Sequence, residues 1–111
     1  MPAMQYPQIA PATLTGADAT YYTVGAVTSA TLCLKLEIWL CNTHTASVAV
    51  TLNAVPSGSS SSTANQIFAD TLQAKKTRAL TIFLNLEENG TLHGLAATSG
   101  VVAMRLAPAE V

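Results

Sequence analysis

An alternating pattern runs through residues 32 to 41 and constrains the fold more than any other feature. One face of the run carries Leu32, Leu34, Leu36, Ile38 and Leu40, and the other carries Cys33, Lys35, Glu37, Trp39 and Cys41. Successive side chains of a β-strand point to opposite faces, so this period of two predicts a long strand with one face on a core.

A second alternating run follows after a tight polar turn. Asn42-Thr43-His44-Thr45 separates the two runs, and Pro56-Ser57-Gly58 ends the second. The second run places Val48, Val50, Leu52 and Ala54 on one face. Two long alternating strands in succession indicate an antiparallel β class.

Shorter segments of the same kind fill the remaining sequence. We expect strands in residues 21–24, 70–72, 78–84, 91–97 and 101–106, with Leu80, Ile82 and Leu84 on one face. Asn89-Gly90 predicts a type I′ hairpin, because both central positions of that turn need a positive φ. Residues 63–68 fit either one helical turn or an extended segment anchored by Ile67 or Phe68. About seven or eight strands predict an all-β, antiparallel β-sandwich of jelly-roll-like form.

The chain has 111 residues, which suits one domain. Residues 1–20 contain Pro2, Pro7 and Pro11, and proline is excluded from central strands. We therefore expect an extended N-terminal arm over residues 1–20, with an edge strand near residues 8–14, and a sandwich domain over residues 21–111. A frayed terminus is the alternative for the arm.

The composition favours a protein that assembles with other proteins. Charged residues make up 10% of the chain, against about 25% in a typical domain, while 19 Ala, 15 Thr and 8 Ser are present. A surface of small, uncharged side chains costs little to desolvate at an interface. A monomer kept soluble by its hydroxyl groups is the alternative. The net charge of −1 and the lack of a basic stripe argue against nucleic acid as a partner.

Membrane and secretory signals are also missing from the sequence. No apolar run approaches the roughly 20 residues of a membrane helix. The first residues do not combine a basic segment with an apolar one, so we do not expect a secretory signal.

The two cysteines are predicted to be free. Cys33 and Cys41 lie eight residues apart on one strand, which separates their Cα atoms by about 27 Å, whereas a disulfide needs about 4.4–6.8 Å. Free thiols suit synthesis in a reducing cytoplasm. His44 and His93 could bind zinc together with Cys41, but these are three ligands and a structural zinc site needs four. We therefore expect both histidines to lie at the surface, and we expect no metal or cofactor.

No catalytic residue is assigned. The GxSxG elbow, phosphate loops and dinucleotide motifs are absent, and the neighbouring Glu87 and Glu88 would point apart in an extended chain. We therefore predict that the protein is not an enzyme.

Six residues are candidates for contact with a partner. Trp39 lies opposite the leucine face, where it either packs under a second layer or anchors an interface. Lys75, Lys76 and Arg78 form the basic cluster, which is either an exposed turn or a contact for an acidic neighbouring subunit. Tyr6 and Ile9 are the apolar residues with which the arm would reach a neighbour.

One longer pattern carries a family resemblance. A strand ends in Cys-Asn-Thr, a short polar turn follows, and a strand with Val-Thr-Leu stops at Val-Pro-Ser-Gly, as in IWLCNTHTASVAVTLNAVPSG. Flanking segments are YYTVGAVTSATL and ANQIFADTLQAKKTRALTIFLNLEENGTLHGLAATSGVVAMRLAPAEV. With these segments, about four fifths of the chain resembles small β-sandwich proteins encoded in tailed-phage virion gene clusters.

The resemblance implies a structural role. Such proteins are capsid decoration (cement) proteins, or small tail and fibre components. The expected partners are the major capsid protein or other virion proteins, and the expected state is a homo-oligomer, a trimer, made in the host cytoplasm and placed on the capsid surface. A carbohydrate-binding module on a tail fibre is the second reading. The family offers no catalytic motif for these positions.

Overall fold

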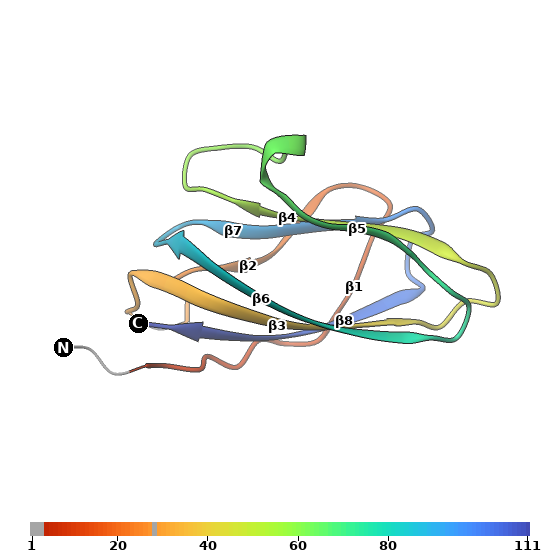
Figure 1. Cartoon of the computed structure of the whole chain (residues 1–111), viewed down its shortest axis with the longest axis horizontal. Coiled ribbons are helices and arrows are strands. Elements are labelled where there is room, and N and C mark those ends of the chain that lie inside the picture. Colours follow the sequence, from red (N-terminus) through yellow and green to blue (C-terminus); the bar gives the residue numbers. More distant parts are fainter. Residues whose placement is uncertain (1–3, 28) are drawn as a thin grey trace.

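The computed structural model describes residues 4–27 and 29–111, which form two antiparallel sheets packed face to face (Figure 1). The β3 sheet has the order β1 (Ala12–Thr13), β8 (Val102–Glu110), β3 (Leu32–Asn42) and β6 (Thr77–Glu87). The β4 sheet has the order β2 (Ala19–Thr23), β7 (Thr91–Ala96), β4 (Val48–Val55) and β5 (Gln66–Leu72). Eight strands in this order form a jelly roll, which confirms the predicted fold class.

Most connections cross between the sheets. Among consecutive strands, only β4 and β5 are hydrogen-bonded neighbours. The turn at Asn89 therefore does not close a hairpin, as the sequence had predicted, but carries the chain from β6 to β7 in the other sheet. Asn89 has a φ of 69°, whereas Gly90 lacks the positive φ of a type I′ turn. Gly90 is needed for space, because a Cβ there would lie 2.7 Å from Leu86.

The core forms between the inner faces of the two sheets. The buried apolar residues alternate along the main strands. The strands β3, β4, β7 and β8 each contribute two or more of them. They include Leu36, Ile38, Leu40, Val48, Val50, Leu52, Leu92, Val102 and Met104. Leu72 and Leu86 are buried at the ends of β5 and β6.

Irregularities in strand pairing place some residues of β3 and β4 on a different face from the one predicted. A register shift between Cys33 and Lys35 occurs in both ladders of β3, so the alternation changes phase there. Cys33 consequently lies in the core rather than beside Trp39 on the outer face. Leu32 and Leu34, which were predicted on the core face, are only partly buried and lie outside the core cluster. In β4, Val55 is buried where Ala54 had been predicted, and the ladder with β5 shifts after Leu52.

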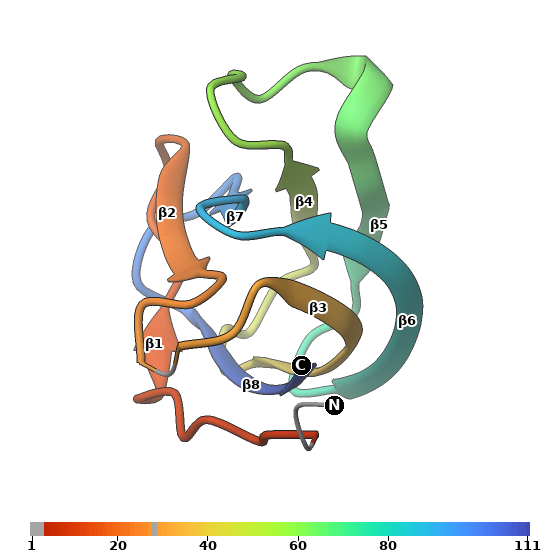
Figure 2. The ribbon, with the colours of Figure 1, turned by 90° about the vertical axis from the view of Figure 1, so that its left-hand side faces the viewer.

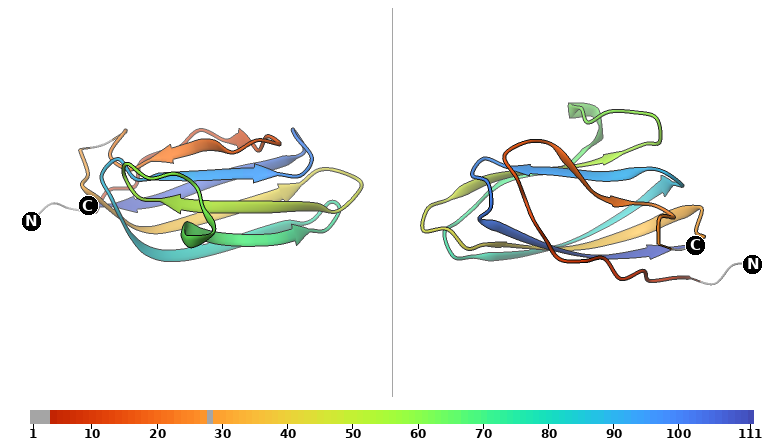
Figure 3. Two further views of the ribbon diagram at one scale, coloured as in Figure 1. Left: turned by 90° about the horizontal axis from the view of Figure 1, so that it is seen from above. Right: turned by 180° about the vertical axis from the view of Figure 1, so that it is seen from behind.

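The described part of the predicted arm lies along the sandwich. Gln5 pairs with Glu110, β1 pairs with β8, and Leu14 is fully buried in the core (Figure 3). The edge strand expected near residues 8–14 is thus present as β1. Residues 1–3 of the predicted arm lie outside the described residues.

The serine-rich connection between β4 and β5 protrudes from the β4 sheet, on the side away from the β3 sheet (Figure 2). The 3-10 turn η1 (Thr63–Asn65) is followed directly by β5. The predicted helical turn is therefore present at residues 63–65, and the predicted extended segment is present at residues 66–68. Ile67 and Phe68 are partly buried against the core.

Asn42 joins the β3–β4 loop to the β5–β6 turn at one end of the sandwich. Its side chain is fully buried, and its amide nitrogen lies 3.0, 3.1 and 3.2 Å from the carbonyl oxygens of Ala46, Leu72 and Gln73. Its side-chain oxygen accepts a hydrogen bond from the His44 amide at 2.9 Å. The β3–β4 loop and the β5–β6 turn are therefore held by one side chain.

A second buried polar contact joins the sheets. The Tyr22 hydroxyl donates to the carboxylate of Glu110, which also accepts from the Gly25 amide at 3.3 Å. Burial, followed by the hydrogen bond to Glu110, raises the pKa of Tyr22 far above its usual range. Burial likewise raises the pKa of the Cys33 thiol. Both groups are therefore held in their protonated forms.

Candidate protein-protein interface

The outer face of the β3 sheet carries an apolar surface around Trp39. Cross-strand pairing places Trp39 between Ala79 of β6 and Arg105 of β8. Trp39 remains 41% exposed because its neighbours are small or extend past it. A hollow of about 560 Å³ lies here, lined by Trp39, Cys41, Thr77, Ala103 and Arg105. We call these five residues the Trp39 patch.

Phe83 extends the exposed apolar surface of the same sheet. Its side chain is 78% exposed and lies opposite Lys35 in the ladder between β6 and β3. The Lys35 ammonium is 3.3 Å from the Glu37 carboxylate, and these two side chains separate Phe83 from Trp39. The face thus presents two exposed aromatic side chains, a residue class enriched at protein interfaces, with an ion pair between them whose charges offset each other.

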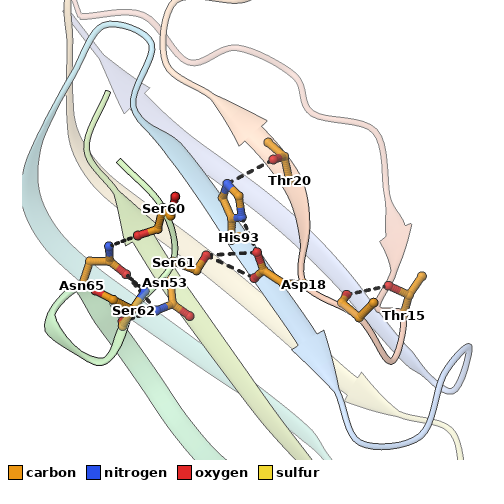
Figure 4. Close-up of polar contacts among 10 residues, drawn as sticks. Thr15, Asp18, Thr20, Asn53, Ser60, Ser61, Ser62, Asn65 and His93 are labelled. Atoms are coloured by element: carbon orange, nitrogen blue, oxygen red, sulfur yellow. Dashed lines mark hydrogen bonds and ion pairs between the residues drawn. The ribbon is translucent and has the colours of Figure 1, made fainter. Parts of the chain in front are cut away.

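The opposite outer face, on the β4 sheet, is polar and bonded within itself. His93 Nδ1 lies 2.8 Å from an Asp18 oxygen, and His93 Nε2 lies 3.1 Å from the Thr20 hydroxyl (Figure 4). The Ser61 hydroxyl donates to Asp18 at 3.1 and 3.2 Å. One carboxylate therefore connects β7, the start of β2 and the serine-rich loop.

Asparagine side chains complete this polar face. The Asn53 amide donates to the Ser62 carbonyl at 2.7 Å and to the Asn65 side chain at 2.8 Å, and the Asn65 amide donates to the Ser60 carbonyl at 2.9 Å (Figure 4). Polar groups that already bond to one another gain little from a partner. The β3 sheet therefore presents the better interface of the two outer faces.

The order of hydroxyl, imidazole and carboxylate in Thr20, His93 and Asp18 is that of a nucleophilic triad. The sequence predicted no such set, because these residues are far apart in the chain. The hollow beside the serine-rich loop is lined by Asp18 without Thr20 or His93, and the hollow beside the N-terminal segment is lined by Thr20 without His93. Neither hollow is lined by both Thr20 and His93, so we interpret the three residues as a structural set of hydrogen bonds.

The free edge of β6 is the second candidate contact. β6 pairs with β3 along one side, and no strand of the described residues pairs with its other side. Leu80, Ile82 and Leu84 face inward but are only partly buried, since β6 and β5 lie along the same side of the sandwich without forming a ladder (Figure 2). Between Arg78 and Glu87 the strand carries no charge.

The structure separates the predicted contact residues. Trp39 lies on the outer face, opposite Ala79, whereas Arg78 lies opposite Leu40 and turns toward β5. There the Arg78 guanidinium lies 2.6 Å from the Asp70 carboxylate and 5.4 Å from the centre of the Phe68 ring. Arg78 is therefore engaged within the molecule.

The rest of the predicted basic cluster occupies the β5–β6 turn. The Lys75 ammonium donates to the Thr43 carbonyl at 2.7 Å, and Lys75 has a φ of 59°. Lys76 is exposed in the same turn. The hydrogen bond from the Thr71 amide has the largest effect in lowering the pKa of Asp70, and the hydrogen bond from Arg78 lowers it further. Lys75 and Arg78 thus bond to different segments, while Lys76 and Arg78 line one hollow beside the β5–β6 turn.

In the N-terminal segment, Tyr6 is exposed and Ile9 packs against the core. His44 lies in the β3–β4 loop, and His93 and Cys41 lie on the outer faces of opposite sheets. The cysteines are both free, as predicted. Phe83 was not predicted as a contact residue. The alternation within β6 places its side chain on the face away from Leu80, Ile82 and Leu84, which could have indicated its exposure.

The jelly roll is similar to a known structure of low sequence identity. No family model and no curated protein sequence matches the chain. A solved structure described as "Bacillus endospore appendages form a novel family of disulfide-linked pili" has a TM-score of 0.60 and 13% identity, and the match covers 97% of this chain and 85% of that one. The likeness concerns the fold. None of the described residues forms a helix long and apolar enough to cross a membrane.

Proposed function

We propose that this protein is a structural subunit that acts by assembling with other proteins, and specifically that it is a capsid decoration protein of a tailed phage. The observation that carries the proposal is the Trp39 patch, an exposed apolar hollow on a face whose counterpart is polar and bonded within itself. The virion setting comes from the sequence resemblance.

The surface chemistry supports an assembly role. Tryptophan and arginine are the residues that most often contribute strongly to binding energy at interfaces, and Trp39 and Arg105 are directly opposite one another. Ala79 and Ala103 beside Trp39 are small, so a partner side chain can reach the Trp39 ring. Contact would bury apolar area at a stabilisation of about 25 cal/mol per Å² before the costs of association.

A fibre or appendage subunit is the second candidate. It is favoured by the fold likeness to a protein described as forming pili. In that case copies of the chain would be the main partners, whereas a decoration protein binds a preformed shell.

Co-sedimentation with capsids tests the proposal. Capsids assembled from the major capsid protein encoded in the same gene cluster should retain the wild-type protein in the pellet. The variant Trp39→Glu should lower the bound fraction at least tenfold. Leu95→Glu is the matched control, since Leu95 is a partly exposed residue on the outer face of the β4 sheet.

Each outcome decides between the candidates. Binding that is lost in Trp39→Glu and kept in Leu95→Glu supports the decoration role. Failure of the wild type to bind capsids, combined with concentration-dependent growth of long oligomers, would favour the fibre subunit. A wild-type protein that neither binds capsids nor self-associates would refute the assembly function.

A further inference from the structure

We propose that the free edge of β6 pairs with β6 of a second copy, antiparallel and centred on Phe83, so that two β3 sheets join into one continuous sheet. This inference rests on the proposed assembly function and names one of its contacts. It concerns a different surface from the Trp39 patch.

The first argument is the lack of edge protection. Natural edge strands are commonly blocked by charges, proline, bulges or short length, because their free backbone groups invite pairing. β6 has 11 residues, and its eight residues from Ala79 to Leu86 contain neither charge nor proline. The register shift in its ladder with β3 lies near one end, between Cys33 and Lys35. A soluble chain with such an edge needs a partner strand to cover it.

The second argument is the row of partly buried residues behind that edge. Leu80, Ile82 and Leu84 contact the core on one side only, and Ile67 and Phe68 of β5 are partly buried on the same side of the sandwich. A second sandwich joined at β6 would cover these side chains with its own equivalents. A short peptide strand would complete the backbone pairing but would not supply that second apolar layer, so another copy of this chain fits better.

The third argument fixes the register. Residues opposite one another in an antiparallel pair share a face, so inward residues must meet inward residues, and a slip of one residue is forbidden. Centring the pair on Phe83 places Ile82 opposite Leu84 and Leu80 opposite Leu86 of the second copy. The same register brings Arg78, whose guanidinium bonds Asp70 but stays about half exposed, opposite Glu88, which is exposed just beyond the strand end. Opposite charges therefore meet at both ends of the pair.

The alternative register, centred on Ile82, loses this complementarity. It places Arg78 opposite Leu86 and Glu87 opposite Thr77. The register centred on Phe83 is thus the one that the charges favour. Such a contact is isologous and closes as a dimer.

Cysteine crosslinking tests the pairing and its register together. In a Cys41→Ala background, Phe83→Cys should give a disulfide-linked species of twice the 11.5 kDa chain mass under mild oxidation. Thr81→Cys alone should not crosslink, but Thr81→Cys combined with Asn85→Cys should, since these positions are opposite one another. No disulfide from Phe83→Cys, or equal crosslinking from Thr81→Cys alone, would overturn the inference.

Light scattering separates this inference from the proposed function. Wild-type protein should have a dimer mass at about 100 μM, and Phe83→Lys should shift it to a monomer mass because two lysines would then face each other. The control Ala107→Lys, on the same outer face but away from the edge, should remain dimeric. A trimer, or a dimer that survives Phe83→Lys, overturns the β6 pairing while leaving the assembly role intact. A wild-type protein that is a monomer but still binds capsids would also overturn the β6 pairing and leave the assembly role intact.

Discussion

Replacing Asn42 by aspartate should destabilise the fold strongly although the two side chains have nearly the same shape. The buried amide nitrogen, which lies 3.0–3.2 Å from three carbonyl oxygens, would become an oxygen. The amide has two N–H groups shared among these three oxygens, and at about 1 kcal/mol for each lost hydrogen bond their loss costs about 2 kcal/mol. An ionised carboxylate facing those carbonyls adds at least about another 2 kcal/mol, so we expect a loss of about 4 kcal/mol at pH 7.

Urea unfolding measures this loss. For a domain whose total stability is about 5–15 kcal/mol, a change of about 4 kcal/mol should lower the unfolding midpoint by about 2–3 M urea. Circular dichroism provides a signal that does not depend on the single tryptophan. Asn85→Asp, measured in dilute protein so that the proposed β6 pair is not formed, is the control, because it adds the same charge at an exposed position of β6 and should change stability by less than about 0.5 kcal/mol.

The pH dependence gives a second check on the same substitution. Protonation of the new carboxyl restores one donor, so the difference between the two variants should narrow at pH 4. If Asn42→Asp lies within 1 kcal/mol of Asn85→Asp at pH 7, the Asn42 contacts do not hold the two loops in the way described.

Three further predictions concern the core. Leu14→Ala should cost about 2–5 kcal/mol in chemical unfolding, whereas a change below about 0.5 kcal/mol would indicate that the N-terminal segment is a dispensable arm. Gly94→Ala should cost about 1–3 kcal/mol in thermal unfolding, because its Cβ would lie 2.8 Å from a core leucine; Gly16→Ala, with 3.8 Å of clearance, should cost less than about 1 kcal/mol. The raised pKa values of Tyr22 and Cys33 should make stability fall above about pH 9, because the unfolded chain releases protons that the folded one keeps, at up to about 1.4 kcal/mol per pH unit for each group. Urea titrations from pH 7 to 10.5 should show a shallower decline in Tyr22→Phe, and equal slopes would contradict the assignment.

The strands were predictable from the sequence because alternation is a local signal. Leu36, Ile38 and Leu40 are buried as the period of two requires. The bulge near Cys33 was not predictable, since it appears only when β3 meets β6 and β8 in a fixed register. The turn at Asn89 shows the same limit: its residues favour a reversal of direction, but they do not determine which sheet receives the next strand.

The candidate interface was predictable in part for a similar reason. The face on which Trp39 lies follows from alternation within one strand. Whether that face is covered, and which strand forms an edge, depends on strand order, which no local pattern encodes. The basic cluster illustrates the difference, because Lys75 and Arg78 are three residues apart in the sequence yet bond to different segments.

The crossing connections have a consequence for how the chain acquires its structure. β8 occupies an interior position between β1 and β3, although it is the last of the eight strands to leave the ribosome. Until it emerges, β1 and β3 cannot be joined, and the β4 sheet, whose four strands all precede β8, has only an incomplete sheet to cover its inner face. The β4 sheet cannot bury that face by itself, so we expect slow, all-or-none folding after synthesis of β8, as is typical of folds dominated by distant contacts.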